Sequence, residues 1–434
     1  MQFKQYPSYK NSGVEWLGEV PEGWQVIPSK FYFIERKEKA ENTDKQLTAS
    51  QKLGIIFQED FMAENGRVMV VMKNPEILKK VRPNDFVISM RSFQGGLELS
   101  YLEGSISSAY VMLKPNLNVV NIEYFKYLFK TTRYIQSLQS TSNLIRDGQA
   151  LRFNNFSEVK WVLPSKSDQQ KIVSFLDTET ARIDNLINKQ QKLIELLEEQ
   201  RKSIISYAVT KGLNPNVPMK DSGVEWLGEV PESWHVAVVK RAFIVKLGKM
   251  LQPDQKDETD VFKKYLKASN ITWDGVKDID NEMWFSENEL KKLKLEIGDL
   301  LVAEGGDVGK SCIFDSSEEF YYQNSINRVR GQKNNANKFL YYWLFTLKYS
   351  GYIDILCNKS TIAHFTAEKL NETILLLPDG VEQNEIIAYL DRENEKINHF
   401  VLKQNHLIEK LKEYRSSIIS HAVTGKIDVR EWGA

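Results

Sequence analysis

Two long stretches of the sequence carry apolar residues at alternating spacings of three and four, which is typical of a helix with one apolar face. The first series is Ile183, Leu186, Gln190, Leu193, Leu197 and Ile204, with one position skipped, and the second is Ile397, Phe400, Gln404, Leu407, Leu411, Tyr414 and Ile418. The segments 169–210 and 383–424 contain neither glycine nor proline. We therefore predict two helices of about 60 Å each that pair along their seams as a coiled coil.

The matching seams belong to an internal duplication of the whole chain. Residues 10–24 (KNSGVEWLGEVPEGW) and 220–234 (KDSGVEWLGEVPESW) are identical at 13 of 15 positions, at an offset of 210. Residues 169–210 and 383–424 are identical at 21 of 42 positions, at an offset of 214. The order of Trp-rich segment, globular region and long helix thus occurs twice.

The two globular regions, 25–168 and 235–382, share their pattern more than their residues. VRPNDFVI at 81–88 matches LEIGDLLV at 295–302, a turn and an Asp followed by a strand. An aromatic-rich amphipathic helix is expected at 122–129 and again at 338–345, and a last strand closed by Pro at 159–164 and 373–378. We predict an α+β fold with two mixed domains joined by an antiparallel coiled-coil spacer.

The repeats are circularly offset. The Trp-rich segment 220–234 follows the first helix, whereas its twin 10–24 precedes the first domain instead of following the second helix. A pseudo-two-fold arrangement therefore has to close as a ring, which predicts that the N- and C-termini are neighbours.

Composition narrows the class of protein. Lys+Arg and Asp+Glu both number 58, so the net charge is zero, but residues 28–164 carry a net charge of +5 and residues 241–377 a net charge of −1. Neither domain is a polycation, so a DNA-binding role implies that partner chains supply much of the attraction to the backbone. No apolar run is long enough to span a membrane, the N-terminus lacks a signal-peptide core, and Cys312 and Cys357 make no disulfide framework. These features predict a cytoplasmic protein.

Catalytic and metal-binding motifs do not emerge. EGGDVGKS at 304–311 approaches a phosphate-binding loop, but Glu304 stands where the first Gly is needed, and the next residues indicate a strand rather than a helix. We expect a Gly-rich hairpin loop there. The duplicated Asp85 and Asp299 stand at strand starts, where a turn-capping role is favoured over catalysis. No metal is expected.

The duplicated motifs resemble the specificity subunits of type I restriction–modification systems, a bacterial defence. The resemblance rests on W-L-G-x-V-P-x-x-W (16–24, 226–234), on the closing strand and Pro followed by Q-x-x-I-x-x-x-L-D (169–177, 383–391), and on the S-I-I-S-x-A-V-T helix ends. It covers nearly the whole chain, and the motifs occur twice in the same order.

The resemblance implies how the chain is divided into domains and what each part does. A Trp-rich segment plus target-recognition domain would span 1–164 (domain 1) and again 213–378 (domain 2), with spacer helices at 165–212 and 379–434. The domains would read the two halves of a bipartite asymmetric DNA sequence, and the helices would dock two methyltransferase subunits, through which restriction subunits join. The chain itself would be non-catalytic and without a cofactor, because S-adenosylmethionine, ATP and Mg would be bound by the partner subunits.

Candidate DNA-binding residues are polar and basic side chains on loops, since these groups read base edges. They are Arg91, Ser92, Gln94, Arg146, Gln149 and Arg152 in domain 1, and Lys310, Asn324, Asn327, Arg328, Lys359, Thr361 and His364 in domain 2. Trp16, Trp24, Trp226 and Trp234 have two interpretations: they pin each segment to its domain, or they form a docking surface for the methyltransferase subunit.

Two other classes compete with a specificity subunit. A coiled-coil scaffold has little reason to diversify two duplicated bodies. An enzyme, such as a fused nuclease or methyltransferase, would need motifs that the sequence lacks. The sequence does not decode the bases that are read or the length of the gap between half-sites.

Overall fold

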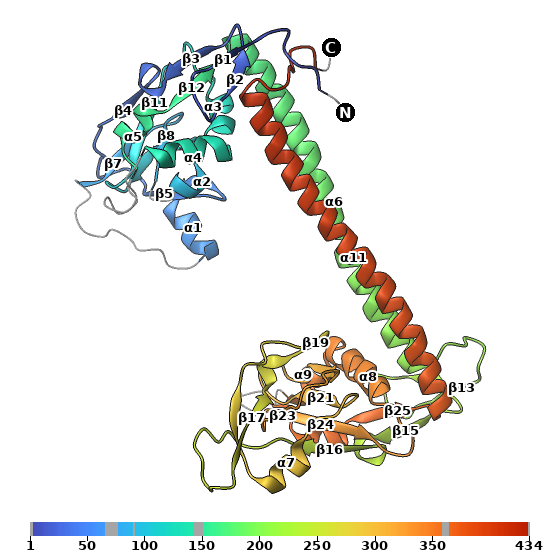
Figure 1. Cartoon of the computed structure of the whole chain (residues 1–434). Helices are drawn as coiled ribbons and strands as arrows, with labels where there is room; N and C mark the ends of the chain where they lie inside the picture. The colour runs from blue at the N-terminus through green and yellow to red at the C-terminus, as the bar shows by residue number, and fades with distance from the viewer. Residues whose placement is uncertain (1–2, 66–76, 90–91, 142–150, 358–363, 433–434) are drawn as a thin grey trace. The chain divides into compact units, whose positions relative to one another are not determined.

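The computed structural model describes residues 3–65, 77–89, 92–141, 151–357 and 364–432. The chain forms two compact units, Met1–Gln190 with Asn405–Ala434 (unit 1) and Gln191–Gln404 (unit 2). Two long helices, α6 (Lys166–Lys211) and α11 (Gly380–Val423), each have one half in either unit (Figure 1). This division differs from the boundaries predicted from the sequence because each half-helix is counted with the domain on which it packs.

Unit 1 is built on a four-stranded antiparallel sheet of order β4-β11-β8-β9. Its strands and helices before α6 are β1 (Tyr9–Asn11), β2 (Glu19–Pro21), β3 (Gln25–Pro28), β4 (Phe33–Arg36), β5 (Leu47–Ser50), β6 (Gly54–Phe57), α1 (Gln58–Asn65), β7 (Lys79–Val81), β8 (Phe86–Ile88), α2 (Ser92–Gly95), β9 (Glu98–Leu99), β10 (Gly104–Ile106), β11 (Val111–Pro115), α3 (Ile122–Leu128), α4 (Thr132–Ser140), α5 (Phe153–Glu158) and β12 (Lys160–Leu163). Two-stranded ladders β1-β2, β3-β12, β5-β6 and β7-β10 complete it.

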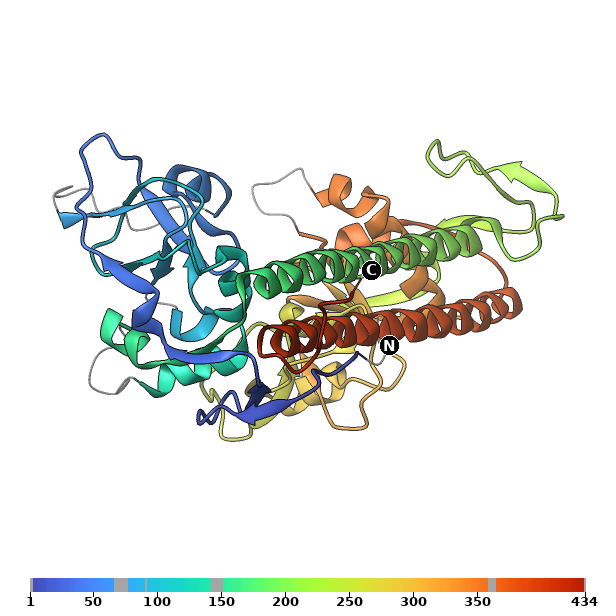
Figure 2. The same cartoon turned by 90° about the horizontal axis from the view of Figure 1, so that it is seen from above.

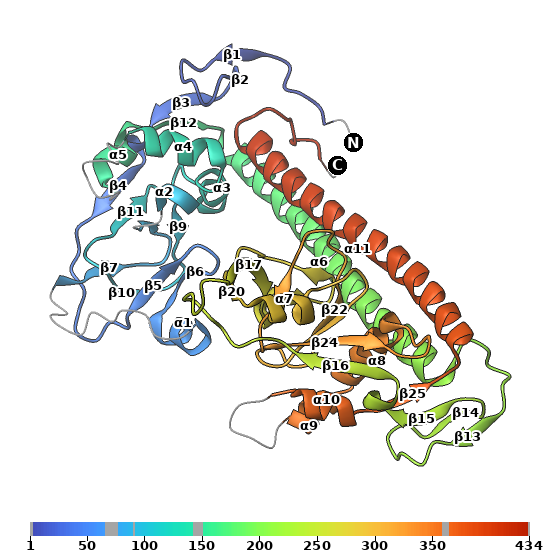
Figure 3. The same cartoon turned by 60° about the horizontal axis from the view of Figure 1, so that its bottom comes forward.

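Unit 2 has the corresponding sheet, β16-β24-β21-β22, and a separate sheet β20-β17-β23. Its elements between the long helices are β13 (Met219–Asp221), β14 (Glu229–Pro231), β15 (His235–Val238), β16 (Phe243–Leu247), β17 (Val261–Leu266), β18 (Ile271–Thr272), β19 (Gly275–Val276), β20 (Glu282–Phe285), α7 (Glu287–Leu293), β21 (Leu300–Ala303), β22 (Ser311–Ile313), β23 (Tyr321–Tyr322), β24 (Ile326–Gly331), α8 (Asn337–Tyr349), α9 (Tyr352–Cys357), α10 (Ala367–Glu372) and β25 (Ile374–Leu377). Figure 3 shows the hairpin β13-β14 beside the strands β15 and β25.

The two units repeat one frame. In each, a short hairpin carries the W-L-G segment, and the strand after it pairs antiparallel with the last strand before a long helix: Gln25 faces Leu163, and His235 faces Leu377. The predicted aromatic helix at 122–129 is confirmed, since Tyr124, Phe125, Leu128 and Phe129 are fully buried. Together with the long helices, this confirms the predicted α+β class.

A buried glutamine at the start of each long helix attaches that helix to its domain. Gln169 accepts the backbone N–H of Asn121 at 2.8 Å and donates to the carbonyls of Val119 and Pro164. Gln383 likewise accepts the N–H of Ala336 at 2.9 Å and donates to the carbonyl of Pro378. These are the first residues of the duplicated Q-x-x-I-x-x-x-L-D motif, so its polar start has a structural reason.

Within each unit the two helix segments run side by side in opposite directions (Figure 2). The sequence placed Phe400, Leu407 and Tyr414 in the seam of α11, and this part of the prediction is wrong, because they are 50%, 42% and 38% exposed. Ile408, only 5% exposed, takes the place of Leu407. Val401 and Ile408 directly follow Phe400 and Leu407 in the sequence and are also apolar. The spacing of apolar residues alone therefore does not decide which of these residues face the partner helix.

The predicted closure of the chain is confirmed within unit 1. The N–H of Asp428 donates to the carbonyl of Lys4 at 2.8 Å, and the Lys4 ammonium pairs with Glu431 at 2.7 Å. Lys426, just past the end of α11, donates to the carbonyl of Leu17 in the first W-L-G segment. The segments that lead to the two ends of the chain therefore lie together, as the blue and red traces in Figure 1 show.

Candidate nucleic-acid interface

Three loops that the sequence singled out in domain 2 meet in the structure. The Gly-rich residues 304–310 connect the paired strands β21 and β22, which confirms the predicted hairpin. The N–H of Phe365 donates to the Glu304 carbonyl at 2.8 Å, and the Asn327 side chain donates to the Phe365 carbonyl at 3.3 Å. The ring of His364 lies 3.7 Å from where a Cβ on Gly305 would stand, the distance of an ordinary van der Waals contact, so His364 is a neighbour of the Gly-rich loop.

The charges of this loop cluster are balanced locally. Lys310 pairs with Asp307 at 2.8 Å, and Lys348 pairs with Asp307 at 3.2 Å and with Asp354 at 2.8 Å. Burial raises the pKa of Glu304, while the nearby His364 and a hydrogen bond from Asn327 act in the opposite direction. Sequence reasoning missed Asp307 and Lys348, because the ion pair between these two residues joins separate segments of the chain.

The remaining candidates of domain 2 differ in accessibility. His364 is exposed, and Asn324 and Lys310 are partly exposed, so all three present polar groups at the surface. Asn327 is fully buried, and Arg328 is 4% exposed and donates to the carbonyls of Lys292 and Lys294. Both side chains are therefore occupied by contacts inside the domain.

In domain 1 the described candidates also separate into two kinds. Ser92 is fully buried, and its hydroxyl accepts the N–H of Ser89 at 2.8 Å, as expected for a residue that begins a short helix. Gln94 and Arg152 are exposed. Five further candidates lie outside the described residues: Arg91, Arg146, Gln149, Lys359 and Thr361.

The duplicated aspartates cap turns, as the sequence favoured. Asp85 accepts the N–H of Arg82 and binds the Arg36 guanidinium through both oxygens, at 2.6 and 2.9 Å. Asp299 accepts the N–H of Glu296 and binds both sides of the Arg330 guanidinium. Arg36 lies on β4 but Arg330 on β24, so the two copies keep the acid and take its partner from different strands.

The tryptophans of the W-L-G segments pack mainly inside each unit. Trp24 is 3% exposed, and Trp234 is fully buried with its ring N–H donating to Glu382 at 2.8 Å, which favours the pinning interpretation for both. Trp16 contacts Tyr134 edge-on at 6.1 Å. Trp226 contacts Tyr352 in a tilted ring pair at 4.8 Å but remains 40% exposed, so its two interpretations both stay open.

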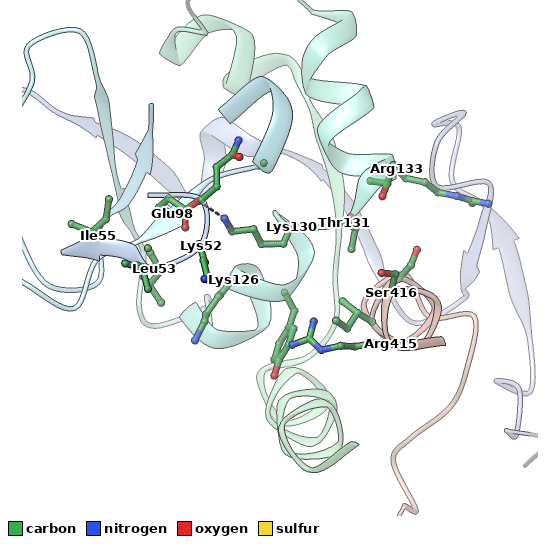
Figure 4. Close-up of a pocket in the computed structure, with 18 of the residues that line it drawn as sticks. Lys52, Leu53, Ile55, Glu98, Lys126, Lys130, Thr131, Arg133, Arg415 and Ser416 are labelled. Atoms are coloured by element: carbon green, nitrogen blue, oxygen red, sulfur yellow. Dashed lines mark hydrogen bonds and ion pairs between the residues drawn. The ribbon is translucent and has the colours of Figure 1, made fainter. Parts of the chain in front are cut away.

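A cavity of about 930 Å³ lies in unit 1 between domain 1 and α11 (Figure 4). Its basic lining residues are Lys52, Lys126, Lys130, Arg133 and Arg415, against the single carboxylate of Glu98. The sequence analysis missed this group, although Lys126, Lys130 and Arg133 have the spacing of one helix face. Hydroxyl groups of Thr131 and Ser416 also line the cavity.

The described residues contain no cluster of three or more His, Cys, Asp or Glu that could hold a metal ion. Both cysteines are buried free thiols, and burial raises the pKa of Cys312 to about 12. Across the part of the chain that the structure describes, no helix is both long and apolar enough for a membrane span.

Comparison with known proteins gives one consistent family. Residues 243–410 match the model of the type I restriction modification DNA specificity domain. The chain is 25% identical over 425 residues to the MjaVIII specificity subunit of Methanocaldococcus jannaschii, covering 95% of this chain and 94% of that protein. It is 22% identical over 458 residues to the EcoKI specificity subunit of Escherichia coli K12, covering 96% and 92%.

Solved structures share the fold. A chain from a structure concerned with assembly and conformational transition of the type I R-M system superposes with a TM-score of 0.69 at 14% identity, covering 93% of this chain and 98% of that one. The HsdS subunit from Thermoanaerobacter tengcongensis gives 0.56 at 13% identity, covering 94% and 98%. The family match, the related specificity subunits and the shared fold together support a specificity subunit of a type I restriction–modification system, as the duplicated motifs predicted.

Proposed function

We propose that the chain reads a bipartite, asymmetric DNA target, with domain 1 on one half-site and domain 2 on the other. The observation that carries this proposal is the repetition of one frame with different loops. The strands β4-β11-β8-β9 and β16-β24-β21-β22 follow the same order, whereas the loops around Gln94 and Lys310 share neither sequence nor hydrogen bonds. Two modules on one frame suit two half-sites at a fixed spacing.

Base reading is assigned to the accessible loop residues. In domain 2 these are Lys310, Asn324 and His364, and in domain 1 Gln94 and Arg152. The five candidates outside the described residues, Arg91, Arg146, Gln149, Lys359 and Thr361, remain part of the proposal because they stand close to these residues in the sequence. A bidentate contact to a base edge discriminates by about 1–3 kcal/mol.

The catalytic steps are assigned to partner chains. Two methyltransferase subunits would dock on the helices and on the W-L-G segments, where Trp226 keeps an exposed ring. They would bind S-adenosylmethionine and methylate adenine, and restriction subunits joined to them would use ATP and Mg. The chain itself would contribute recognition and spacing without catalysis, and a cytoplasmic location follows from this role.

The test is to co-purify the chain with the methyltransferase subunit encoded beside it and to map methylated adenines across a genome. A bipartite motif with an unspecified gap supports the proposal, whereas a stable complex that leaves no motif contradicts it. Arg152→Ala and Lys310→Ala then assign the domains. Each should relax one base position in a different half of the motif, and Lys160→Ala, an exposed lysine on β12, should leave both halves intact.

A further inference from the structure

The net charge of +5 in residues 28–164 raises the question of where the surplus cations of domain 1 lie. The large cavity of unit 1 gathers several of them on one surface (Figure 4). Lys52 lies in the turn between β5 and β6, Lys126 lies on α3, and Lys130 lies just after the end of α3. Arg415 lies on α11, which forms the opposite wall. Side chains far apart in sequence thus meet around one opening.

Some of these cations already have acidic partners. Lys130 pairs with the buried Glu98, Lys126 with Glu123 at 3.0 Å, and Arg415 with Asp184 at 2.9 Å. For Lys52 and Arg133, by contrast, the described residues provide no ion pair. Both side chains are exposed, and Figure 4 shows the side chain of Arg133 extending away from Lys52 and Lys130.

Lys426 lies close to Arg133. Burial lowers the pKa of Lys426, the neighbouring guanidinium of Arg133 lowers it further, and the carboxylate of Glu19 acts in the opposite direction. The pKa of His421 is lowered in the same way, first by burial and then by Arg133 and Lys426. Basic groups whose charged forms disfavour one another are typical of a surface that awaits an anion.

The equivalent place in unit 2 has a different character. On the helix wall Arg201 and Ser206 correspond to Arg415 and Ser420 at the offset of 214, but Lys202 stands at the place of Ser416; these residues of unit 2 line two smaller cavities of about 440 and 550 Å³. The domain wall differs.

Asn121 and Ala336 donate their backbone N–H groups to equivalent glutamines, Gln169 and Gln383. Residues next to Asn121 in unit 1 therefore correspond to residues of unit 2 at an offset of 215. With that offset Phe345 replaces Lys130, and Lys348 replaces Arg133. Lys348 is neutralised by Asp307 and Asp354. The two surfaces therefore differ in where their cations lie: on the domain wall Arg133 of unit 1 corresponds to the neutralised Lys348, whereas on the helix wall unit 2 has Lys202, over the ring of Tyr349, in place of Ser416.

This asymmetry identifies the kind of ligand. A methyltransferase subunit that docks twice would meet equivalent surfaces in both units, and these two surfaces are unlike. An asymmetric DNA target differs between its halves, and its backbone offers phosphates, which Lys, Arg, Ser and Thr side chains bind. We propose that the cavity lined by Lys52, Lys126, Arg133 and Arg415 holds backbone phosphates of the DNA on the domain 1 side. The inference rests on the proposed function and adds a sequence-independent anchor to it.

The variant Lys52→Ala/Arg133→Ala tests the anchor without leaving a carboxylate unpaired. The charge-matched control is Lys30→Ala/Lys160→Ala, two exposed lysines of the same unit away from this cavity. Each variant is purified in complex with the methyltransferase subunits. Binding is measured from about 0.05 to 0.3 M salt, on a labelled duplex carrying the mapped motif and on a duplex of unrelated sequence.

The expected result is a roughly tenfold rise in Kd on both duplexes at about 0.15 M salt, with the slope of log K against log salt reduced by about 2. The methylated motif and the recovery of the complex should be unchanged. Pyrophosphate, titrated at constant ionic strength, should compete with DNA for the wild-type complex, since its phosphate groups can enter the cavity. If pyrophosphate binds but the double variant binds DNA as the wild type does, the proposal is overturned.

Three other outcomes overturn it as well. Equal behaviour of the double variant and its control removes the anchor. A lost complex with the methyltransferase subunits assigns the cavity to protein docking. A motif altered at one base assigns it to base reading. Failure of the proposed function is distinguishable, because the wild-type complex would then leave no bipartite motif at all.

Discussion

Arg201 donates from its guanidinium to the side-chain oxygen of Asn398 at 2.6 Å, across the two helices of unit 2. The residues 214 positions away on each helix, Arg415 and Asp184, make the equivalent contact in unit 1 as an ion pair at 2.9 Å. Duplication has therefore preserved the register of the antiparallel helices in both units. One acid has been replaced by its amide, and the geometry has been kept.

Asn398→Asp should restore the lost charge of this pair. We expect a gain of about 0.2–1 kcal/mol, the usual range for a partly exposed ion pair. The gain should be present at neutral pH, disappear below about pH 4 as the new carboxyl is protonated, and shrink in high salt. Thermal unfolding at several pH values measures it. The reciprocal variant Asp184→Asn should lose a similar amount in unit 1, and a gain there instead would contradict the assigned equivalence.

The buried glutamines that attach the long helices to their domains, Gln169 and Gln383, are a second pair of equivalent residues. Gln169→Leu leaves the N–H of Asn121 and the carbonyls of Val119 and Pro164 without their partner in a buried place. We expect a loss of about 2–4 kcal/mol, or a fall in Tm of roughly 5–15 °C. The neighbouring Gln170→Leu removes one exposed hydrogen bond and should cost under about 1 kcal/mol. If the two leucine variants lower Tm equally, the buried Gln169 stabilises the protein no more than the exposed Gln170 does.

Much of the frame could be predicted from the sequence, because duplication marks it directly. Two copies of W-L-G-x-V-P-x-x-W and of the Q-x-x-I-x-x-x-L-D helix start fixed the order of parts, and their circular offset predicted the contact of Lys4 with the residues after α11. The seam was predicted less well. Val401 and Ile408 form a series as apolar as Phe400 and Leu407, so only the packing of the partner helix decides which faces inward.

The candidate site could be predicted only in part, because accessibility depends on distant partners. Ser92, Asn327 and Arg328 have the residue types of base readers but are buried. Conversely, the basic cavity depends on Arg415 lying opposite Lys52, residues separated by most of the chain. Residue type and loop position do not contain that information, which arises from the fold.

The arginine–carboxylate cluster of domain 1 makes the stability of the protein depend on pH. Hydrogen bonds from Arg82, and then from Arg36, lower the pKa of Glu38 to about 2. Because the folded value lies below the unfolded value, this stabilisation is present above about pH 4.3 and is lost as the pH falls toward 2. Glu38→Gln should lower Tm by about 1–3 °C at pH 7, and the difference should vanish near pH 2. A constant difference across this range would contradict the assignment.

The ring closure of the chain depends on a glycine. Gly425 follows α11 with φ of +73°, and a Cβ there would stand 2.4 Å from Pro21 and 3.1 Å from Trp24. Gly425→Ala should therefore combine the strain of a positive φ with displacement of the N-terminal hairpin. Gly13 has nearly the same φ, +66°, and open space around its Cβ, so Gly13→Ala is the matched control for strain alone.

We expect Gly13→Ala to cost about 1 kcal/mol and Gly425→Ala clearly more, because Pro21 belongs to the backbone of β2 and cannot rotate away. Limited proteolysis at Lys4 and Lys10 reports on the hairpin, since both lysines precede it or lie on its first strand. Faster cleavage in Gly425→Ala than in Gly13→Ala means that the hairpin is held by the end of α11. Equal cleavage rates would mean that the contacts of Lys4 and Lys426 hold the hairpin without this close approach.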